Sequence, residues 1–209
     1  MGEVCLHVEL LSHTPDPQGI VAMAAKLCYS SVDIDRLKEG IERADQSSFI
    51  AKLMDMGHLS PVEHASFTFG VEGVSRSLLA QITRHRIASF SVKSQRYVTE
   101  KSKDGKTFNY IIPEGIKALG QHSVEKFKQQ MLQIQEWYDE WLELLGDKGE
   151  SSNEDARFVL PNAAETKFLV TMNARELLHF FSLRCCNRAQ WEIRALAKEM
   201  LKLVLPVAP

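Results

Sequence analysis

The sequence has 209 residues, 44% hydrophobic and 25% charged, with a formal net charge of −2. This length suits one domain with a full hydrophobic core, and this composition excludes a disordered or fibrous chain. The apolar runs are far shorter than the roughly 20 residues of a membrane helix, and the N-terminal residues lack a basic flank with an apolar core, so we expect no secretory signal. We therefore expect a cytoplasmic protein with no membrane partner, and the near-neutral charge argues against a general nucleic-acid binder.

The spacing of the potential metal ligands excludes two common kinds of site. The four cysteines, which include no CxxC pair, are Cys5, Cys28, Cys185 and Cys186. A zinc ribbon or a disulfide framework is therefore not predicted, and we expect buried or unreactive thiols. His58, Glu63 and His64 lack the i, i+4 spacing of a metalloprotease helix, so no metal site is predicted.

Hydrophobic periodicity predicts several short elements in the first third of the chain. They are, in order, a strand over residues 4–11, a helix after Asp16, helices over residues 34–41 and 50–54, and a strand over residues 65–71. Asp16 followed by Pro17 supplies an N-cap and a first-turn proline. Gly57 is a favourable residue for ending the third helix. Alternation of apolar and polar residues predicts that the second strand is half-buried.

The remaining chain predicts further helices and one more strand. They are a helix over residues 78–82, a loop from Thr99 to Thr107 with a turn at Asp104-Gly105, a long helix over residues 116–145, a strand over residues 166–172, and helices that begin near residues 174 and 193. Asn173 and Glu176 resemble a capping box. Because helices and strands do not alternate regularly, we expect a single α+β domain over residues 1–209, with a small sheet packed by several helices, one of them long.

Positive charge is concentrated between residues 76 and 97. This stretch carries five cations and no acid, whereas residues 133–155 carry eight acids and one lysine. An anionic ligand is therefore expected at the positive stretch. Arg84 and Arg86 flank His85, and on a helix residues two apart diverge by about 200°, which would suit two different anions or ligands of neighbouring subunits. A solvated basic helix end is the alternative.

Three further segments are rich in functional side chains. They are Gly57–His64, with the sequence GHLSPVEH, Glu154–Pro161, with the sequence EDARFVLP, and Asn173–Ile193. In the last segment, the i, i+4 spacing of Arg175 and His179 places them on one helix face. Each segment alone also fits a salt bridge or a cap. Together they hold more arginines than buried structural pairs need, which favours a site for phosphorylated ligands.

Four runs in this order resemble the flavin-dependent thymidylate synthases. They are GHxSPxEH from Gly57 to His64, RHR-x7-S from Arg84 to Ser94, EDARxVLP from Glu154 to Pro161, and NAR...LR...AQWEI from Asn173 to Ile193. His13–Pro17 and Leu27–Ser31 also look like the N-terminal region of that family, so the resemblance spans nearly the whole chain. It implies a homotetramer with active sites between subunits. It also implies methylation of dUMP to dTMP, with methylenetetrahydrofolate as carbon donor and FAD reduced by NADPH.

The resemblance also implies roles for individual residues. The implied dUMP-binding residues are Gln81, Arg84, Ser94, Gln95, Arg96, Arg157 and Arg184. The implied FAD contacts are Ser60, Glu63, Arg84, His85, Arg86, Asn173, Arg175 and His179. Arg184 and His58 are the implied catalytic residues, and Arg184 would stabilise negative charge on the uracil ring. The chain departs from the family pattern at Ser91-Val92, often Asn-Glu, at Arg188, often histidine, and at His179, where asparagine is frequent.

Two alternatives remain open from the residues alone. A nucleic-acid-binding module without catalysis could use the positive stretch, although only Phe90 and Tyr97 could stack on bases there. A structural scaffold could pair its arginines with the acidic stretch. Ser94 has no adjacent base, so it fits a phosphate ligand better than a nucleophile. A bound flavin would separate the alternatives, because it gives the protein visible absorption.

Overall fold

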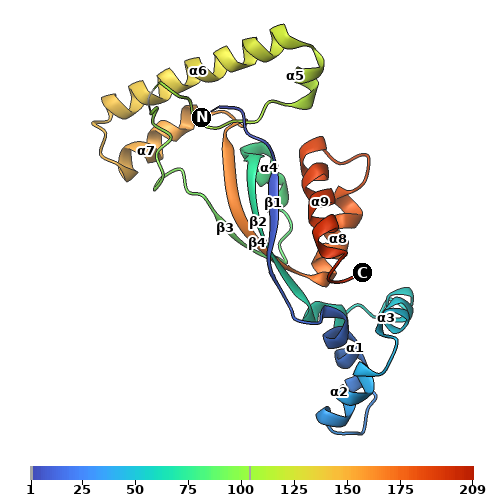
Figure 1. The fold of residues 1–209 in the computed structure, drawn as a ribbon. Coiled ribbons are helices and arrows are strands. Elements are labelled where there is room, and N and C mark those ends of the chain that lie inside the picture. The colour runs from blue at the N-terminus through green and yellow to red at the C-terminus, as the bar shows by residue number, and fades with distance from the viewer. Residues whose placement is uncertain (1, 104) are drawn as a thin grey trace. The chain divides into compact units, whose positions relative to one another are not determined.

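The computed structural model describes residues 2–103 and 105–209, which combine helices with a four-stranded sheet (Figure 1). The helices are α1 (Pro17–Leu27), α2 (Ile34–Glu42), α3 (Gln46–Asp55), α4 (Arg76–Ile82), α5 (Glu114–Ala118), α6 (Gln121–Leu144), α7 (Glu150–Ala156), α8 (Ala174–Arg184) and α9 (Trp191–Val204), with 3-10 turns η1 (Pro61–His64) and η2 (Arg157–Val159). The strands β1 (His7–His13), β2 (Ser66–Ser75), β3 (Ala88–Val92) and β4 (Glu165–Asn173) pair in the order β1-β2-β4-β3. The expected α+β class, with a small sheet and one long helix, is confirmed.

The described residues group into two compact units. Unit 1 contains the chain up to His7, Val71–Thr83 and Ser91–Phe168, and unit 2 contains Val8–Gly70, Arg84–Phe90 and Leu169–Pro209. A single domain over residues 1–209 stays a prediction. None of the helices in the described part of the chain is long and apolar enough to cross a membrane.

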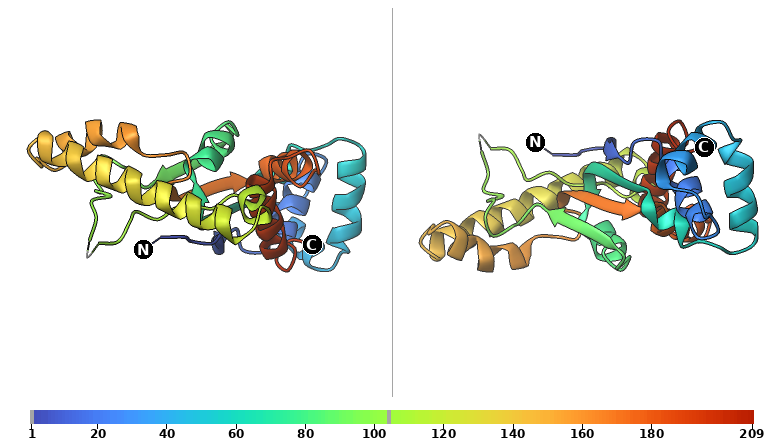
Figure 2. Two further views of the ribbon diagram at one scale, coloured as in Figure 1. Left: turned by 90° about the horizontal axis from the view of Figure 1, so that it is seen from above. Right: turned by 90° about the horizontal axis from the view of Figure 1, so that it is seen from below.

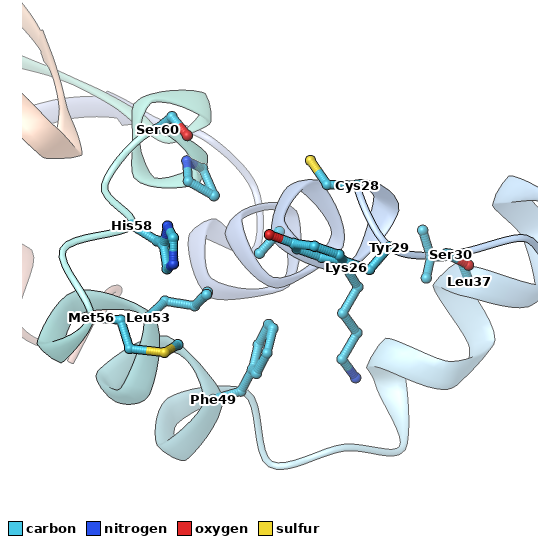
Figure 3. Close-up of a pocket in the computed structure, with 12 residues that line it drawn as sticks. Lys26, Cys28, Tyr29, Ser30, Leu37, Phe49, Leu53, Met56, His58 and Ser60 are labelled. Atoms are coloured by element: carbon cyan, nitrogen blue, oxygen red, sulfur yellow. The ribbon is translucent and has the colours of Figure 1, made fainter.

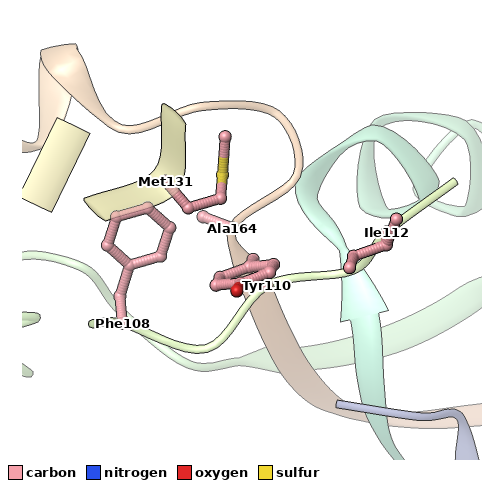
Figure 4. Packing of buried hydrophobic residues seen from close by; sticks show 5 residues of the cluster. All are labelled: Phe108, Tyr110, Ile112, Met131 and Ala164. Carbon is pink, nitrogen blue, oxygen red and sulfur yellow. The ribbon is translucent and has the colours of Figure 1, made fainter. Parts of the chain in front are cut away.

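The core of unit 1 is covered by the long helix α6. Figure 4 shows Phe108, Tyr110 and Ile112 along one chain segment, packed with Met131 of α6 and with Ala164. Farther along α6, a second cluster is formed by Tyr138, Leu142 and Ala156. Helix α7, which supplies Ala156, packs beside α6 (Figure 2). Burial of these apolar side chains therefore fixes α6 and α7 together in unit 1.

Unit 2 is built from two groups of helices and parts of the strands. Helix α1 packs against α2, α3 and η1, while α8 packs against α9 and η1. The first three helices each begin at an aspartate whose carboxylate accepts a backbone N–H of the first turn: Asp16, Asp33 and Asp45. Such caps satisfy backbone donors that the helix itself leaves free. Thr68 of β2 and Thr171 of β4 share a hydrogen bond of 2.9 Å between their hydroxyls.

Most predicted elements are present, with two differences of extent. The predicted helix over residues 116–145 is two helices, α5 and α6, because Gly120 adopts a positive φ of 95° between them. The predicted strand over residues 4–11 is β1, which lies slightly later in the chain. Strand β3 and helix α7 were not predicted.

Two further expectations concern the thiols and the loop over residues 99–107. Cys5 and Cys28 are exposed free cysteines, so they are not buried, and the expectation that they are unreactive stays a prediction. The loop contains no helix or strand among its described residues and has an isolated bridge between Lys103 and Lys106. The predicted turn includes Asp104, which lies outside the described residues.

Gly73 lies where two chain segments of unit 1 approach closely. Its φ is +68°, a left-handed conformation that favours glycine. A Cβ at this position would lie 1.8 Å from the carbonyl oxygen of Cys5. Any side chain here would therefore force the backbone of residues 5 and 73 apart.

We expect Gly73→Ala to lower the free energy of unfolding by about 2–4 kcal/mol, because it adds backbone strain to a backbone clash. Urea denaturation of the purified protein measures this loss. Gly40→Ala is the matched control, because no atom lies within 4 Å of the added methyl group in α2. That control should gain about 0.5–1 kcal/mol. Equal stabilities of the two variants would contradict the close approach.

Candidate functional site

The RHR segment follows α4 as an irregular connection to β3. Helix α4 ends at Ile82, and the Thr83 hydroxyl donates a hydrogen bond of 2.8 Å to the carbonyl oxygen of Leu79. The prediction that Arg84 and Arg86 diverge on a helix is therefore wrong.

Within this segment, the histidine and the two arginines have opposite exposures. His85 is buried, whereas Arg84 and Arg86 are exposed. Neither arginine side chain has a hydrogen bond or an ion pair within the described residues. Both guanidinium groups are therefore available to an anion.

His85 contacts two charged side chains of α8. Its Nδ1 lies 2.9 Å from Oε1 of Glu176, and Nε of Arg184 donates a hydrogen bond of 3.1 Å to its Nε2. Its ring also meets Phe180 edge-on, with 5.0 Å between centroids. Burial lowers the pKa of His85, while the hydrogen bond to Glu176 opposes this shift and the charge of Arg184 adds to it. The neutral ring is thus favoured.

Helix α8 presents functional residues both to His85 and to a neighbouring cavity. Asn173 caps the helix by accepting the backbone N–H of Glu176 at 2.9 Å. Only this half of the predicted capping box forms, because the carboxylate of Glu176 contacts His85 instead. Glu176, Phe180 and Arg184 follow at intervals of four residues, so one face meets His85.

The end of Arg184 is free for a ligand. Arg184 is the last residue of α8 and is only partly buried. Its Nε is engaged by His85, but its two terminal amino groups have no partner within the described residues. A guanidinium held in this way can offer a pair of parallel N–H donors to a planar acceptor.

Residues of α8 also line a cavity of about 680 Å³. Its lining residues are Leu59, Glu63, Ile87, Asn173, Arg175, Glu176, Leu178, His179 and Ser182. The structure thus brings together four of the expected FAD contacts, and the predicted shared face of Arg175 and His179 is confirmed. Arg175 and Glu63 form an ion pair at this cavity. His85, Arg84 and Arg86 are not among its lining residues.

A second cavity of about 610 Å³ in unit 2 holds the two remaining candidates of the GHxSPxEH run. Figure 3 shows His58 and Ser60 on one side of it, with Tyr29 and Lys26 on the other side. Phe49 contributes an aromatic wall. His58 and Ser60 therefore do not line the same cavity as Glu63.

In unit 1, Ser94 and Arg96 belong to a turn that is held by α7. The Ser94 hydroxyl accepts the backbone N–H of Arg96 at 3.2 Å. The Arg96 guanidinium pairs with Glu150 at 2.6 Å and Glu154 at 3.0 Å. Asn153 donates a hydrogen bond of 2.8 Å to the Arg96 carbonyl oxygen. In this structure, Arg96 is thus paired with carboxylates of the acidic stretch over residues 133–155.

The other unit 1 candidates differ in exposure and partners. Gln95 is buried, and the Gln81 amide donates a long hydrogen bond of 3.4 Å to the Ser77 carbonyl oxygen. Arg157 follows α7, and its Nε donates to the carbonyl oxygen of Glu154 at 3.1 Å. Arg157 forms no ion pair within the described residues.

Arg76 is a further candidate that motif spacing did not single out. Burial, followed by the positive charge of Arg157, lowers the pKa of its guanidinium, while Glu100 has the opposite effect. Arg76 has no carboxylate within ion-pair distance among the described residues. Two neighbouring guanidinium groups that form no ion pair within the described residues favour an anion beside them. The sequence pointed to Arg76 only as one of the five cations between residues 76 and 97.

Potential metal ligands do not gather at any of these places. Across residues 2–103 and 105–209, no group of three or more His, Cys, Asp or Glu side chains is arranged to hold a metal ion. Exposed arginines that form no ion pair within the described residues, such as Arg84 and Arg86, favour phosphorylated ligands instead.

Comparisons with known proteins define the family. The family model described as thymidylate synthase complementing protein matches residues 9–209. A flavin-dependent thymidylate synthase from Geobacter sulfurreducens is 54% identical over 204 residues, covering 98% of this chain and 84% of the relative. One from Pyrococcus furiosus is 40% identical, covering 94% and 78%. The chain therefore belongs to the flavin-dependent thymidylate synthase family.

Solved structures agree with this assignment. The flavin-dependent thymidylate synthase ThyX of Helicobacter pylori, complexed with FAD and dUMP, has a TM-score of 0.72 and 25% identity, covering 97% of this chain and 94% of that chain. A UMP/dUMP methylase, PolB of Streptomyces cacaoi, bound with 5-Br dUMP, has a TM-score of 0.78 and 25% identity, covering 99% and 92%.

The Arg76–Arg157 neighbourhood makes a prediction about stability. Arg76→Met keeps an apolar stem but removes one of two repelling charges, so we expect Tm to rise by about 1–3 °C at low salt. Added phosphate should stabilise the wild-type protein more than the variant. Arg43→Met, which removes an exposed arginine 3.9 Å from Glu39, is the control. Calorimetric scans in which the two variants respond alike to phosphate would contradict an anion site at Arg76.

Proposed function

We propose that this chain methylates dUMP to dTMP, with methylenetetrahydrofolate as carbon donor and FAD reduced by NADPH as hydride source. The observation that carries the proposal is the guanidinium of Arg184, in a chain of this family. A buried histidine holds its Nε, and its two terminal amino groups have no partner within the described residues. Relatives named for this activity are 54% and 40% identical over nearly the whole chain. A cytoplasmic location remains a prediction.

The donor set around the α8 cavity fits FAD. Arg175, His179 and Asn173 line it, and the exposed Arg84 and Arg86 lack carboxylate partners within the described residues. A dinucleotide carries a diphosphate, which such guanidinium groups bind by charge-assisted hydrogen bonds. The Arg175–Glu63 pair is about half exposed, so a phosphate can replace it at small cost. When bound, FAD supplies the hydride chemistry.

Contacts with dUMP are proposed for arginines that would bind its phosphate and for further residues around the nucleotide. Arg84 and Arg157, assisted by Arg76, would neutralise the phosphate. Arg96 would exchange its half-exposed carboxylate partners for the ligand. The remaining proposed contacts are Gln81, Ser94, Gln95 and Arg184.

Arg184 is proposed as the residue that activates the uracil. Its two free amino groups would donate to the ring as negative charge develops there, so their benefit grows from the ground state to the transition state. His58 is proposed as a second catalytic residue. It is exposed and lines the second cavity, where a ligand can reach its ring.

The two alternatives are less favoured. Membership of this family argues against a nucleic-acid-binding module without catalysis. A scaffold with paired arginines describes Arg96, but Arg84, Arg86 and Arg157 have no carboxylate partner within the described residues.

A homotetramer with shared active sites is proposed from the resemblance. The exposed face of α6 supports self-association, because Trp137, Trp141 and Leu144 follow at helical spacing and are 49%, 48% and 69% exposed. Large apolar side chains aligned in this way mark a surface for a partner.

The function is tested first with Arg184→Lys, which keeps the charge but loses the planar pair of donors. We expect dTMP formation from pre-reduced enzyme to fall by roughly 100-fold or more, the range for losing one oxyanion donor. Flavin reduction by NADPH, followed by stopped flow, should stay largely intact. Purified wild-type protein with FAD should absorb in the visible.

Arg43→Lys, at the exposed residue that follows α2, is the control and should leave both half-reactions unchanged. Absence of dTMP formation by the flavin-loaded wild-type protein would refute the proposed function. Wild-type rates in both half-reactions of Arg184→Lys would refute only the role of Arg184.

Shared active sites predict complementation between inactive chains. Arg84→Ala and Arg175→Ala should each abolish most activity, because each removes a cation for a phosphorylated ligand. Mixing the two chains and allowing subunits to exchange should restore part of the activity if different subunits complete one site. Sedimentation should give a tetramer, and an active monomer would contradict the proposal.

A further inference from the structure

His85 lies between a carboxylate and a guanidinium that both come from α8. We propose that His85 and Glu176 form a positioning pair, in which Glu176 holds the proton of His85 on Nδ1 so that Nε2 accepts Nε–H of Arg184 and orients its guanidinium. This inference rests on the proposed function, in which the same guanidinium faces the uracil. It assigns a task to Glu176, which the sequence indicated only as a cap.

The two neighbours determine which ring nitrogen carries the proton. An ionised carboxylate only accepts hydrogen bonds, so the atom 2.9 Å from Glu176 must be a protonated Nδ1. A guanidinium only donates, so the atom 3.1 Å from Arg184 must be an unprotonated Nε2. The opposite tautomer would direct two N–H groups at each other at the Arg184 contact. The neutral Nδ1–H ring therefore satisfies both neighbours.

Because His85 and Glu176 are buried, the hydrogen bonds that join His85 to Glu176 and to Arg184 are hard to replace. The side chains of His85 and Glu176 are 4% and 6% exposed, so water cannot replace a lost partner. Phe180 packs edge-on against the ring and restricts its rotation. The imidazole is consequently a fixed acceptor for Arg184.

The charged groups around His85 define its response to pH. Glu176, Arg184 and His179 face it from α8, while Arg84 and Arg86 on its own segment are exposed. Burial lowers the pKa of His85, so the ring is neutral around pH 7. Below that pKa the ring gains a proton on Nε2, loses its acceptor and repels Arg184. Activity that depends on the contact is therefore lost on acidification.

Anchoring through Nε leaves the catalytic end of Arg184 unoccupied. An arginine side chain has several rotatable bonds, and an unanchored guanidinium would sample many positions. A misplacement of about 1 Å in a positioned group can cost roughly 100-fold in rate. Loss of the His85 contact should therefore lower turnover more than it lowers dUMP affinity.

Two substitutions of His85 separate the loss of the hydrogen-bond acceptor at Nε2 from the loss of the imidazole ring. His85→Gln can place an amide oxygen where Nε2 stands, whereas His85→Asn is too short to do so. We expect single-turnover dTMP formation by the FAD-loaded holoenzyme to fall by roughly 10- to 100-fold in His85→Asn, with dUMP affinity changed only a few-fold. His85→Gln should recover part of the rate. Exposed His122 provides the matched control, His122→Asn, which should behave as wild type.

Glu176→Gln tests the pH response. The carboxylate raises the pKa of His85, so its neutralisation should move the acid limb of the rate profile to lower pH. A residue with a merely structural role would leave the acid limb in place. Glu199→Gln, which breaks an exposed pair with Lys202, is the control for loss of one carboxylate. An unshifted acid limb in Glu176→Gln would overturn the pairing.

A double-mutant cycle tests whether His85 acts through Arg184. In an Arg184→Lys background, His85→Asn should have little further effect, because the contact is already lost. Fully additive losses would overturn the proposal.

Absence of dTMP formation by the wild-type enzyme would refute the proposed function but not the positioning pair. Crystal structures of the His85 variants test the pair independently of activity. We expect the guanidinium of Arg184 to be displaced in His85→Asn and to remain in place in His85→Gln. An unmoved guanidinium in both variants would overturn the positioning role.

Discussion

A buried imidazole stays neutral and fixed only when each ring nitrogen has a partner of the matching kind, and His85 meets this condition with two residues of one helix. Glu176 lies in the first turn of α8 and Arg184 at its end, so a single ring sets both the rotation of the helix and the position of its last side chain. Arg175 and His179 of the same helix line the cavity. The candidate site of unit 2 depends on this one set of hydrogen bonds.

The arginines divide according to whether carboxylates neutralise them. Arg96 and Arg175 are paired, whereas Arg84, Arg86 and Arg157 have no ion pair within the described residues. Exposed pairs are weak and exchange readily for a phosphate. Unpaired cations that repel one another are expected to reduce stability until an anion binds, and burial together with the charge of Arg157 lowers the pKa of Arg76. Retaining such charges lowers stability but favours ligand binding, as is common at functional sites.

Local patterns predicted what depends on near neighbours in the chain. The Asp16 cap of α1, the alternating strand β2 and the shared face of Arg175 and His179 were correct because each follows from spacings of two to four residues. The partners of His85 lie 91 and 99 residues away, and those of Arg96 lie 54 and 58 away, so no local spacing could reveal them. The long helix was extended too far because a glycine with positive φ interrupts it.

The RHR run shows why a motif is less informative than the backbone that carries it. A motif treats its three side chains as equivalent contacts, but the irregular backbone after α4 turns the two arginines outward and the histidine inward. The arginines can meet a ligand directly. The histidine, 5% exposed and hydrogen-bonded at both nitrogens, can influence a ligand through the guanidinium that it holds. Adjacent residues of one motif thereby serve binding and orientation separately, and the division follows from burial rather than from residue type.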